Sequence, residues 1–404
     1  MRRTVIAAAA LAAATGCGKK SAALAEPPDD AATAAAAPAD ASTAPLGLPP
    51  ATEPAVLPGA VTEAPWLDGA ERVAVVEAGG SPLVFVAGPG WIRTASARGE
   101  PRQLAKAVGS AQAIALVDAD GDAIPDVAVA RGRGRQAMKA PASVTVYLHR
   151  SLGRAEHIAL PASERAQVIG LAADPTTPGR LYAGAFDSKY YVTVYALTRR
   201  EANHWTVEPV VRARVAVALA AGDLDGDGAV DLVLARAYGD SADADGDVVR
   251  IEDGERDTLP STRGARSVLI AGGERPSVIY SDGWHKEYGK RARGLITRAR
   301  RRANRWDHAV LDNVAGRWSY DCLALGDLWG DGKQEIVSAG NGPAVIVPLD
   351  ALGPGQARRL GDRNAYWAYP ADLDRDGADE VLLLGPKPGE PERSRGWIWR
   401  RIGR

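Results

Sequence analysis

Residues 215–235 read VAVALAAGDLDGDGAVDLVLA. An apolar run meets a tight acidic loop at Asp223–Asp231, and a second apolar run follows the loop. Short apolar runs bounded by Gly and Asp indicate buried β-strands, because these two residues favour turns. The stretch therefore predicts two short strands that are joined by a carboxylate-rich turn.

The same unit recurs along the chain. Three further copies keep the acidic loop between two apolar runs, at residues 113–130, 323–338 and 368–384. Three more keep the paired apolar runs but lose the acids, at residues 73–86, 168–183 and 268–280. The residues that follow the first run serve as anchors, and they fall at positions 77, 118, 174, 223, 272, 327 and 372. From the first anchor to the last, the mean spacing is about 49 residues.

Each repeat has room for four short strands, and the unit at Val215 is expected to place them at 215–221, 230–235, 247–252 and 256–259. A period of 40–50 residues with four strands indicates the blades of a β-propeller. Seven anchors predict an all-β, seven-bladed propeller, and six blades are the alternative if one unit is misread. The last unit has a third strand at 396–402 and no fourth. A segment near Pro54–Glu63 is expected to supply the fourth strand, which closes the ring and removes two open edges.

The acidic loops share the pattern Asp-x-Asp-x-Asp-Gly-x-x-Asp/Glu. Alternate carboxylates in a tight turn converge on one point and repel one another unless a cation lies among them. Calcium takes six to eight oxygen ligands, so positions 1, 3, 5 and 9 can supply carboxylates and position 7 a backbone carbonyl. The spacing is shorter than that of an EF-hand, whose closing Glu is at position 12. The alternative is that Asp and Gly form these turns without any metal.

The loops, their apolar flanks and the repeat over about residues 65–404 resemble FG-GAP or VCBS repeats, as in the propeller of integrin α-subunits and in many bacterial exported proteins. The resemblance implies a β-propeller with Ca²⁺ in its loops. Carried over position by position, it implies these ligands: Asp118, Asp120, Asp122 and Asp126; Asp223, Asp225, Asp227 and Asp231; Asp327, Asp331 and Glu335; and Asp372, Asp374, Asp376 and Glu380.

Three features depart from the family pattern. Ala123 stands where Gly is usual, so the first loop is expected to be strained. Trp329 replaces the second Asp of the third loop, which is therefore expected to bind calcium weakly or not at all. The similar segment Asp243–Asp247 has Ile251 at position 9 and is interpreted as a solvated hairpin turn. Bound calcium is expected to be structural and to pin the turn between the first two strands of a blade.

The N-terminus resembles a bacterial export signal. Arginines follow Met1, and Thr4–Thr15 is an uncharged, Ala-rich run that is too short to span a bilayer as a helix. The run leads into a lipobox-like segment that ends at Cys17, with Ala14 where lipoproteins usually have Leu. Residues 1–17 are therefore predicted to be a signal peptide that ends at a lipidated Cys17, and a plain signal peptide is the alternative.

Residues 18–52 are rich in Ala and Pro and poor in large apolar residues. Such a segment buries too little surface to offset its ordering entropy, so it is predicted to be a disordered tether. Residues 53–404 are then the propeller. Gly18 stands where an Asp would indicate retention at the inner membrane, which favours the outer membrane; secretion is the alternative.

Composition and motifs argue against several classes of protein. Basic and acidic residues number 49 and 50, and this balance disfavours nucleic acid as a partner. The two cysteines exclude a disulfide framework, and Cys322 lies in an apolar run as a small buried hydrophobe. None of the five His forms a metal-ligand pair, and the chain has no P-loop, nucleophile elbow or dinucleotide fingerprint. An enzyme is therefore not favoured.

One loop, at residues 282–291, combines aromatic and ionisable side chains. Its residues Trp284, His285 and Tyr288 are candidates for a partner surface, and an ordinary surface hairpin is the alternative. The favoured function is a calcium-binding, envelope-anchored propeller that serves as a scaffold for a protein or glycan partner. The alternative is a calcium-assisted hydrolase or lyase that acts on extracellular polysaccharide. The sequence has no convergent acid/base cluster, which favours the scaffold.

Overall fold

A computed structural model describes the chain from Glu53 onward, at residues 53–77, 82–96, 101–132, 141–149, 154–161, 167–187, 191–237, 247–252, 254–259, 264–273, 275–282, 294–302, 305–314, 320–340, 342–387 and 390–402. These residues form 29 strands and one short 3₁₀-helix, η1 (Pro65–Leu67). No helix among them is long and apolar enough to cross a membrane.

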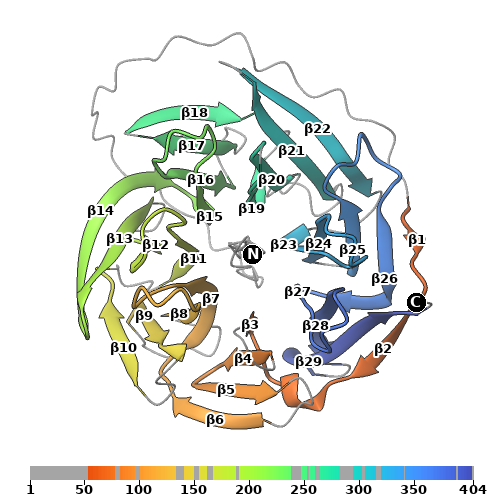
Figure 1. The fold of residues 1–404 in the computed structure, drawn as a ribbon, viewed down its shortest axis with the longest axis horizontal. Helices are drawn as coiled ribbons and strands as arrows, with labels where there is room; N and C mark the ends of the chain where they lie inside the picture. The colour runs from red at the N-terminus through yellow and green to blue at the C-terminus, as the bar shows by residue number, and fades with distance from the viewer. Residues whose placement is uncertain are drawn as a thin grey trace, which may run out of the picture.

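The strands form seven sheets that are arranged as blades around a central axis (Figure 1). Blade 1 contains β3 (Arg72–Val76), β4 (Leu83–Gly88), β5 (Trp91–Ser96) and β6 (Pro101–Lys106). Blade 2 contains β7 (Ser110–Val117), β8 (Asp126–Gly132), β9 (Ser143–Tyr147) and β10 (Ala155–Ala159). Blade 3 contains β11 (Val168–Ala173), β12 (Arg180–Phe186), β13 (Tyr191–Glu201) and β14 (His204–Arg214). Blade 4 contains β15 (Ala216–Gly222), β16 (Asp231–Arg236), β17 (Val248–Glu252) and β18 (Glu255–Leu259).

The remaining blades follow the same order from the axis outward. Blade 5 contains β19 (Ala265–Ala271), β20 (Ser277–Asp282), β21 (Gly294–Arg302) and β22 (Arg305–Val314). Blade 6 contains β23 (Tyr320–Gly326), β24 (Glu335–Gly340), β25 (Gly342–Pro348) and β26 (Arg358–Ala365). Blade 7 contains β27 (Trp367–Ala371), β28 (Glu380–Lys387), β29 (Glu390–Arg401) and the N-terminal β2 (Gly59–Glu63). The predicted seven-bladed propeller is thus confirmed, and the alternative of six blades is wrong.

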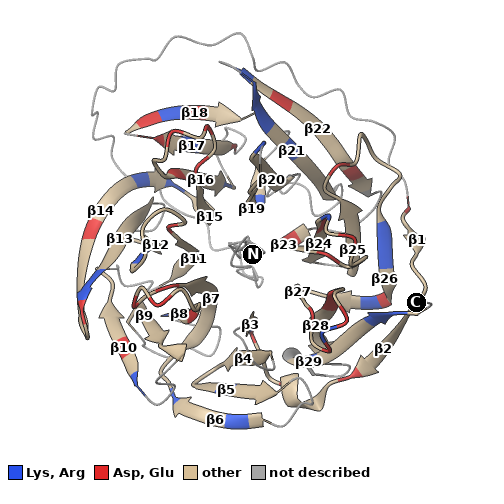
Figure 2. Cartoon of the chain, in the orientation of Figure 1, with Lys and Arg blue, Asp and Glu red and all other residues tan. Residues whose placement is uncertain are grey.

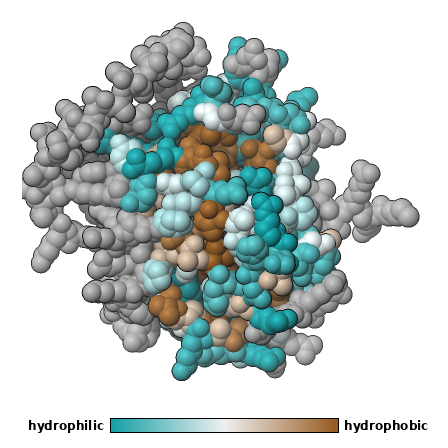
Figure 3. Space-filling view, turned by 90° about the vertical axis from the view of Figure 1, so that its left-hand side faces the viewer, coloured by the Kyte–Doolittle hydropathy of each residue, from teal (hydrophilic) through white to brown (hydrophobic). Residues whose placement is uncertain are grey.

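The burial of a strand follows its place in the blade. β8 lies second from the axis and is buried at every position. β10 lies at the rim of the same blade, and its residues alternate between buried and more exposed. Inner strands face neighbouring blades on both sides and therefore need apolar side chains on both faces. The outer side of the ring near β10 and β14 shows some hydrophobic surface bordered by hydrophilic residues (Figure 3).

Buried arginines join neighbouring blades. Arg131, on β8 of blade 2, is 2% exposed. Its Nη1 donates to the carbonyl oxygens of Gly88 at 3.0 Å and Gly109 at 3.3 Å, and its Nη2 donates to that of Trp91 at 3.0 Å. Backbone carbonyls at the turn between β4 and β5, and just before β7, thus gain the donors that water cannot supply in a buried place.

The N-terminal segment closes the ring. β2 pairs antiparallel with β29, from Gly59 opposite Arg401 to Glu63 opposite Trp397. This pairing confirms that the segment before residue 64 supplies the fourth strand of the last blade. A second contact was not expected from the sequence: β1 (Ala55–Val56) adds to the outer edge of β26 as a parallel strand. The segment therefore contacts both blade 6 and blade 7.

Candidate metal-binding loops

The four acidic loops occupy equivalent places in four blades. Each loop connects the first strand of a blade to the second, and Figure 2 shows their Asp and Glu residues in red on turns near the inner strands. All seven sequence anchors lie directly after a first strand. The four acidic loops run from Asp118 to Asp126 in blade 2, Asp223 to Asp231 in blade 4, Asp327 to Glu335 in blade 6 and Asp372 to Glu380 in blade 7.

The backbone of every acidic loop enters the left-handed region twice. Positions 4 and 6 have positive φ, at Gly121, Gly226, Gly330 and Arg375, and at Ala123, Gly228, Gly332 and Gly377. Glycine suits these positions because it has no Cβ to clash with the neighbouring peptide. Ala123 (φ 64°) and Arg375 (φ 67°) are the two exceptions in these loops. The strain expected at Ala123 is confirmed, whereas that at Arg375 was not foreseen.

The first carboxylate of each loop organises this backbone. Asp118 accepts hydrogen bonds from the amides of Gly121, Asp122 and Ala123 at 2.8–3.1 Å. The equivalent bonds run to Asp223 from Gly226 and Gly228, to Asp327 from Asp331 and Gly332, and to Asp372 from Gly377. Each first carboxylate thus satisfies turn amides that have no partner in a strand.

The ninth carboxylate closes the loop from inside. It accepts the amide hydrogen of position 2, from Ala119 to Asp126 at 3.0 Å, Leu224 to Asp231 at 2.7 Å, Leu328 to Glu335 at 2.9 Å and Leu373 to Glu380 at 2.8 Å. All four acids are buried. Position 9 therefore stabilises the turn, in addition to any contact that it makes with a cation.

Burial disfavours the ionised form of the four acids at position 9. It raises the pKa of Asp126 to about 6 and that of Glu335 to about 7, despite their hydrogen bonds to backbone amides. Burial also raises the pKa of Asp231 and Glu380. A cation beside each group would favour the ionised form and offset this cost.

In three loops, three carboxylates each offer an oxygen within 4.8 Å of the others. The sets are Asp118, Asp120 and Asp122; Asp223, Asp225 and Asp231; and Asp372, Asp374 and Glu380. A further set joins Asp225 and Asp227 to Glu252 of β17. In the described part of the chain the third loop forms no such set, and Asp327, Asp331 and Glu335 remain apart by this measure. Asp122, Asp227 and Asp376 also accept the amide hydrogen two residues further on.

The fourth loop fits a divalent cation best. Oδ1 of Asp372 is buried and has no hydrogen-bond partner. Asp374 and Glu380 offer oxygens beside it, and one oxygen of Glu380 also accepts a hydrogen bond from Nε of Arg400 on β29 at 3.2 Å. A buried oxygen without a donor is uncommon in proteins, and hard carboxylate oxygens are the ligands that Ca²⁺ prefers. The first loop also fits a cation, since Asp118, Asp120 and Asp122 each offer a carboxylate oxygen within 4.8 Å of the others.

The third loop is held by different contacts. The amide of Asp327 donates to the carboxylate of Asp379 in blade 7 at 2.6 Å, and the amide of Asp379 donates back to the Asp327 carbonyl at 2.9 Å. At position 3 the guanidinium of Arg401 stacks on Trp329, 4.5 Å from the ring centre. A neighbouring blade thus supplies a cation–π contact where the other loops have an Asp.

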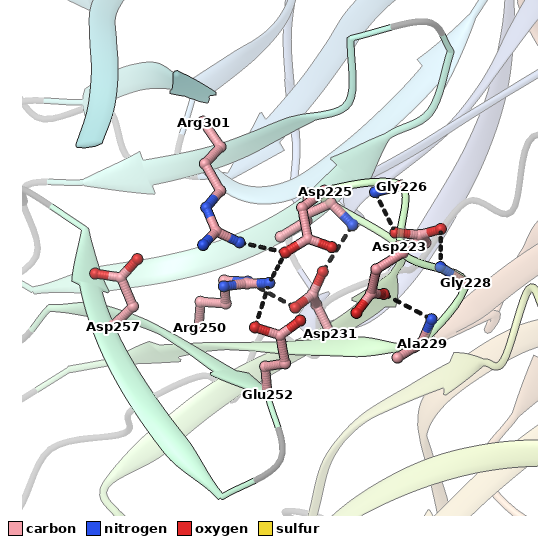
Figure 4. A network of polar contacts seen from close by, with 12 residues as sticks. Asp223, Asp225, Gly226, Gly228, Ala229, Asp231, Arg250, Glu252, Asp257 and Arg301 are labelled. Atoms are coloured by element: carbon pink, nitrogen blue, oxygen red, sulfur yellow. Dashed lines mark hydrogen bonds and ion pairs between the residues drawn. The ribbon is translucent and has the colours of Figure 1, made fainter. Parts of the chain in front are cut away.

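The second loop differs again, because two arginines contact its acids and one of them bridges two carboxylates (Figure 4). Arg250 of β17 donates to Asp225 and to Asp231, and Arg301 of blade 5 also pairs with Asp225. The sequence motif did not predict these residues or Glu252. They lie on a third strand and on the next blade, far from the loop in sequence. The strand at 248–252 has polar side chains at 250 and 252, on one of its two faces. This pattern was the only indication in the sequence that the face contacts polar groups.

Other predicted residues fall elsewhere. Cys322 is fully buried, its thiol lies 3.5 Å from the Ala368 carbonyl oxygen, and burial raises its pKa to about 12. It is therefore an inert core residue, as expected. Asp247 of the Asp243–Asp247 segment forms a two-point ion pair with Arg236. The lipidation candidate Cys17 and the partner-surface candidates Trp284, His285 and Tyr288 lie outside the described residues.

Comparisons with known proteins add evidence on the fold alone. The sequence matches no family model and no curated protein. The chain is similar to the crystal structure of BBS1N in complex with ARL6DN, soaked with lead, with a TM-score of 0.53 and 12% identity over 87% of this chain and 99% of that chain. It is also similar to a chain of the mitotic checkpoint complex, with a TM-score of 0.50 and 16% identity over 94% of this chain and 99% of that one. The likeness agrees with the strand order of the sheets, and the chain is a seven-bladed β-propeller.

Proposed function

We propose that the protein is a calcium-stabilised propeller that is held at the bacterial cell envelope and binds a protein or glycan partner. The observation that carries the calcium proposal is the fourth loop, where the unpartnered, buried Oδ1 of Asp372 lies with oxygens of Asp374 and Glu380. Asp118, Asp120 and Asp122 form the second proposed site. Together with the FG-GAP or VCBS resemblance of the loops, these oxygens favour Ca²⁺ as the cation.

The proposed role of calcium is structural. Each ion would hold the turn between the first two strands of a blade, next to carboxylates that burial disfavours as free anions. A ligand that binds only the folded state adds stability, by about 2.7 kcal/mol per site at a concentration one hundred times its Kd.

The proposed location and partner rest on other observations. Residues 1–17 carry the signal-like pattern with Cys17 as lipid anchor, and residues 18–52 are the proposed tether to the propeller at 53–404. A propeller of similar fold, BBS1N, forms a complex with ARL6DN, which supports a protein as one class of partner. Replacing Cys17 by Ser should move the protein from the membrane fraction to the soluble fraction of the producing cells.

Thermal unfolding tests the calcium proposal. After treatment with a chelator, added Ca²⁺ should raise the Tm by several degrees, and elemental analysis should find bound calcium. Asp374→Asn should remove one ion per chain and reduce the calcium-induced rise. The matched control is Glu201→Gln, at an exposed acid on a hairpin tip, which should bind as much calcium as the wild type. An unchanged Tm together with no bound calcium would refute the proposal.

A further inference from the structure

The Asp223–Asp231 loop already contacts a cation that belongs to the protein (Figure 4). Arg250 lies in the middle of β17 and is 3% exposed. Its Nε donates to Oδ1 of Asp231 and its Nη2 donates to Oδ2 of Asp225, both at 2.6 Å. The same Nη2 lies 2.8 Å from a carboxylate oxygen of Glu252. One guanidinium thus bridges positions 3 and 9 of the loop.

A second guanidinium reaches the loop from the next blade. Arg301 of β21 pairs with the same oxygen of Asp225 that Arg250 contacts. The two ion pairs therefore supply positive charge to the loop without metal and tie the loop of blade 4 to blade 5.

The register position of Arg250 is apolar in the other three acidic blades. It pairs in register with Val233, two residues after the ninth carboxylate. Residues paired across neighbouring strands point to the same face of a sheet, so the equivalent place can be identified in each blade. It is occupied by Val146 opposite Ala128, by Ile346 opposite Val337 and by Ile398 opposite Leu382. Among the four acidic loops, the second alone has an arginine at this position.

A metal ion would compete with these arginines for the same oxygens. Calcium held by Asp225 and Asp231 must displace a guanidinium from at least one of them. The displaced Arg250 would remain buried with fewer partners, and an unpaired buried charge is strongly unfavourable. The equivalent place in blades 2 and 7 is apolar, so no buried guanidinium among the described residues bridges positions 3 and 9 of the first or fourth loop. In blade 7, Arg400 contacts Glu380 at 3.2 Å, but its side chain is 40% exposed and can turn to solvent when an ion binds.

We propose that Arg250 and Arg301 are the resident cations of the Asp223–Asp231 loop, which therefore folds without metal while the first and fourth loops use calcium. The inference rests on the proposed function and narrows it, since it assigns calcium to two of the three loops that form carboxylate sets. The proposal that the two arginines hold the Asp223–Asp231 loop without metal does not depend on whether calcium binds to any other loop. The motif that best matches a calcium loop in sequence is then the one that does not bind calcium.

Two measurements on the full chain test this inference. The first is the Tm in chelator, where Asp225→Asn should lower the Tm by several degrees because it breaks the arginine bridge. The control Asp374→Asn should not lower the Tm there. The second is the number of calcium ions bound, by equilibrium dialysis, which Asp225→Asn should leave unchanged. Arg250→Ile installs the residue of blades 6 and 7 and should add one bound ion per chain.

The outcomes separate this inference from the calcium proposal. Loss of a bound ion in Asp225→Asn would overturn it, as would an unchanged Tm of that variant in chelator. A wild type that binds no calcium would refute the proposed function, whereas a lower Tm of Asp225→Asn in chelator would still support the arginine bridge. If Arg250→Ile does not fold without calcium but folds with it, the arginine is again shown to replace the ion.

Discussion

Asp312 is a buried acid whose surroundings stabilise its negative charge poorly. The residue has no exposed surface, and its Oδ1 is buried without a hydrogen-bond partner. Burial raises its pKa to about 6, although the hydroxyl group of Tyr320 donates to the other oxygen. In the unfolded chain an aspartate has a pKa of about 3.9. The folded state therefore holds the proton more tightly than the unfolded state does.

This difference predicts a pH dependence of stability. A raised acid pKa contributes stability that is fully present below about 3.9 and is lost as the pH rises through about 6. The loss amounts to roughly 3 kcal/mol, at about 1.4 kcal/mol for each pH unit between the two pKa values. Asp312→Asn stays neutral at every pH, so urea unfolding in chelator should show a flatter profile between pH 4 and 7 than in the wild type.

Tyr320→Phe provides the companion variant. It removes the donor that favours the charged carboxylate, so the pH at which stability falls should move upward. Equal slopes for the wild type and Asp312→Asn would show that this carboxyl is not responsible.

At the residue scale the sequence predicted acids better than their partners. Asp225 and Asp231 were identified because a short motif contains them. Arg250 and Arg301 were not, because the contact depends on strand register and on the order of the blades in space. Glu252 was missed for the same reason. A motif within nine residues can specify a turn, but it cannot specify what a strand from another part of the chain brings to that turn.

At the scale of the element, the acidic turn tolerates two residues that do not suit it. Ala123 and Arg375 adopt positive φ at positions where the other loops have glycine. Replacement of Ala123 by Gly should stabilise the protein by about 0.5–1 kcal/mol, since relief of left-handed strain exceeds the added entropy of the unfolded chain. Denaturant unfolding in chelator measures this change, and Arg375→Gly should act in the same direction.

Gly228→Ala is the matched control. It lies at the position of Ala123 in the second loop, with φ 86° and no atom within 4 Å of an added Cβ. It should cost about 1 kcal/mol from backbone conformation alone. If Ala123→Gly were destabilising while Gly228→Ala were neutral, the strain would not be what distinguishes these positions.

Strands were the elements that the sequence predicted most accurately. The expected strand at 230–235 is β16 at Asp231–Arg236, and that at 247–252 is β17 at Val248–Glu252. Continuous apolar runs and Gly-rich turns specify such strands locally. β1 could not be predicted in this way, because two residues hold no period, and its place depends on a free strand edge in blade 6.

At the scale of the whole molecule, closure of the ring depends on a short strand. A chain that begins at residue 64 lacks both β1 and β2 and leaves β29 with an open edge. It should have a lower Tm and a greater tendency to self-associate, because an unpaired edge and the indole of Trp399 beside Gly59 become exposed. Size-exclusion chromatography and thermal unfolding measure both effects.

A chain that begins at residue 58 distinguishes the contribution of β1 to stability from that of β2. It loses β1 and keeps β2, so it should retain most of the stability of a chain that begins at residue 53. Equal stability of all three chains would mean that β2 does not hold the first and last parts of the propeller together.

The blade number followed from the repeat, since each of seven anchors lies after the first strand of a blade. The contacts that hold neighbouring blades together did not follow from the repeat. Arg131, for example, gives no sign in sequence that it reaches the carbonyls of Gly88 and Trp91. Period and strand count define how many sheets form, whereas their mutual attachment is a property of side chains that meet only after folding.

The pairing of β2 with β29 also determines when the propeller can close during synthesis. Thr62 and Ile398, which share a hydrogen bond across this pair, are separated by 336 positions. A ribosome makes β2 before any blade and makes β29 after six of them, so the first strand waits through nearly the whole of synthesis for its partner. Until then the ring is open, and a chaperone that holds the early segment would delay the closure of the propeller.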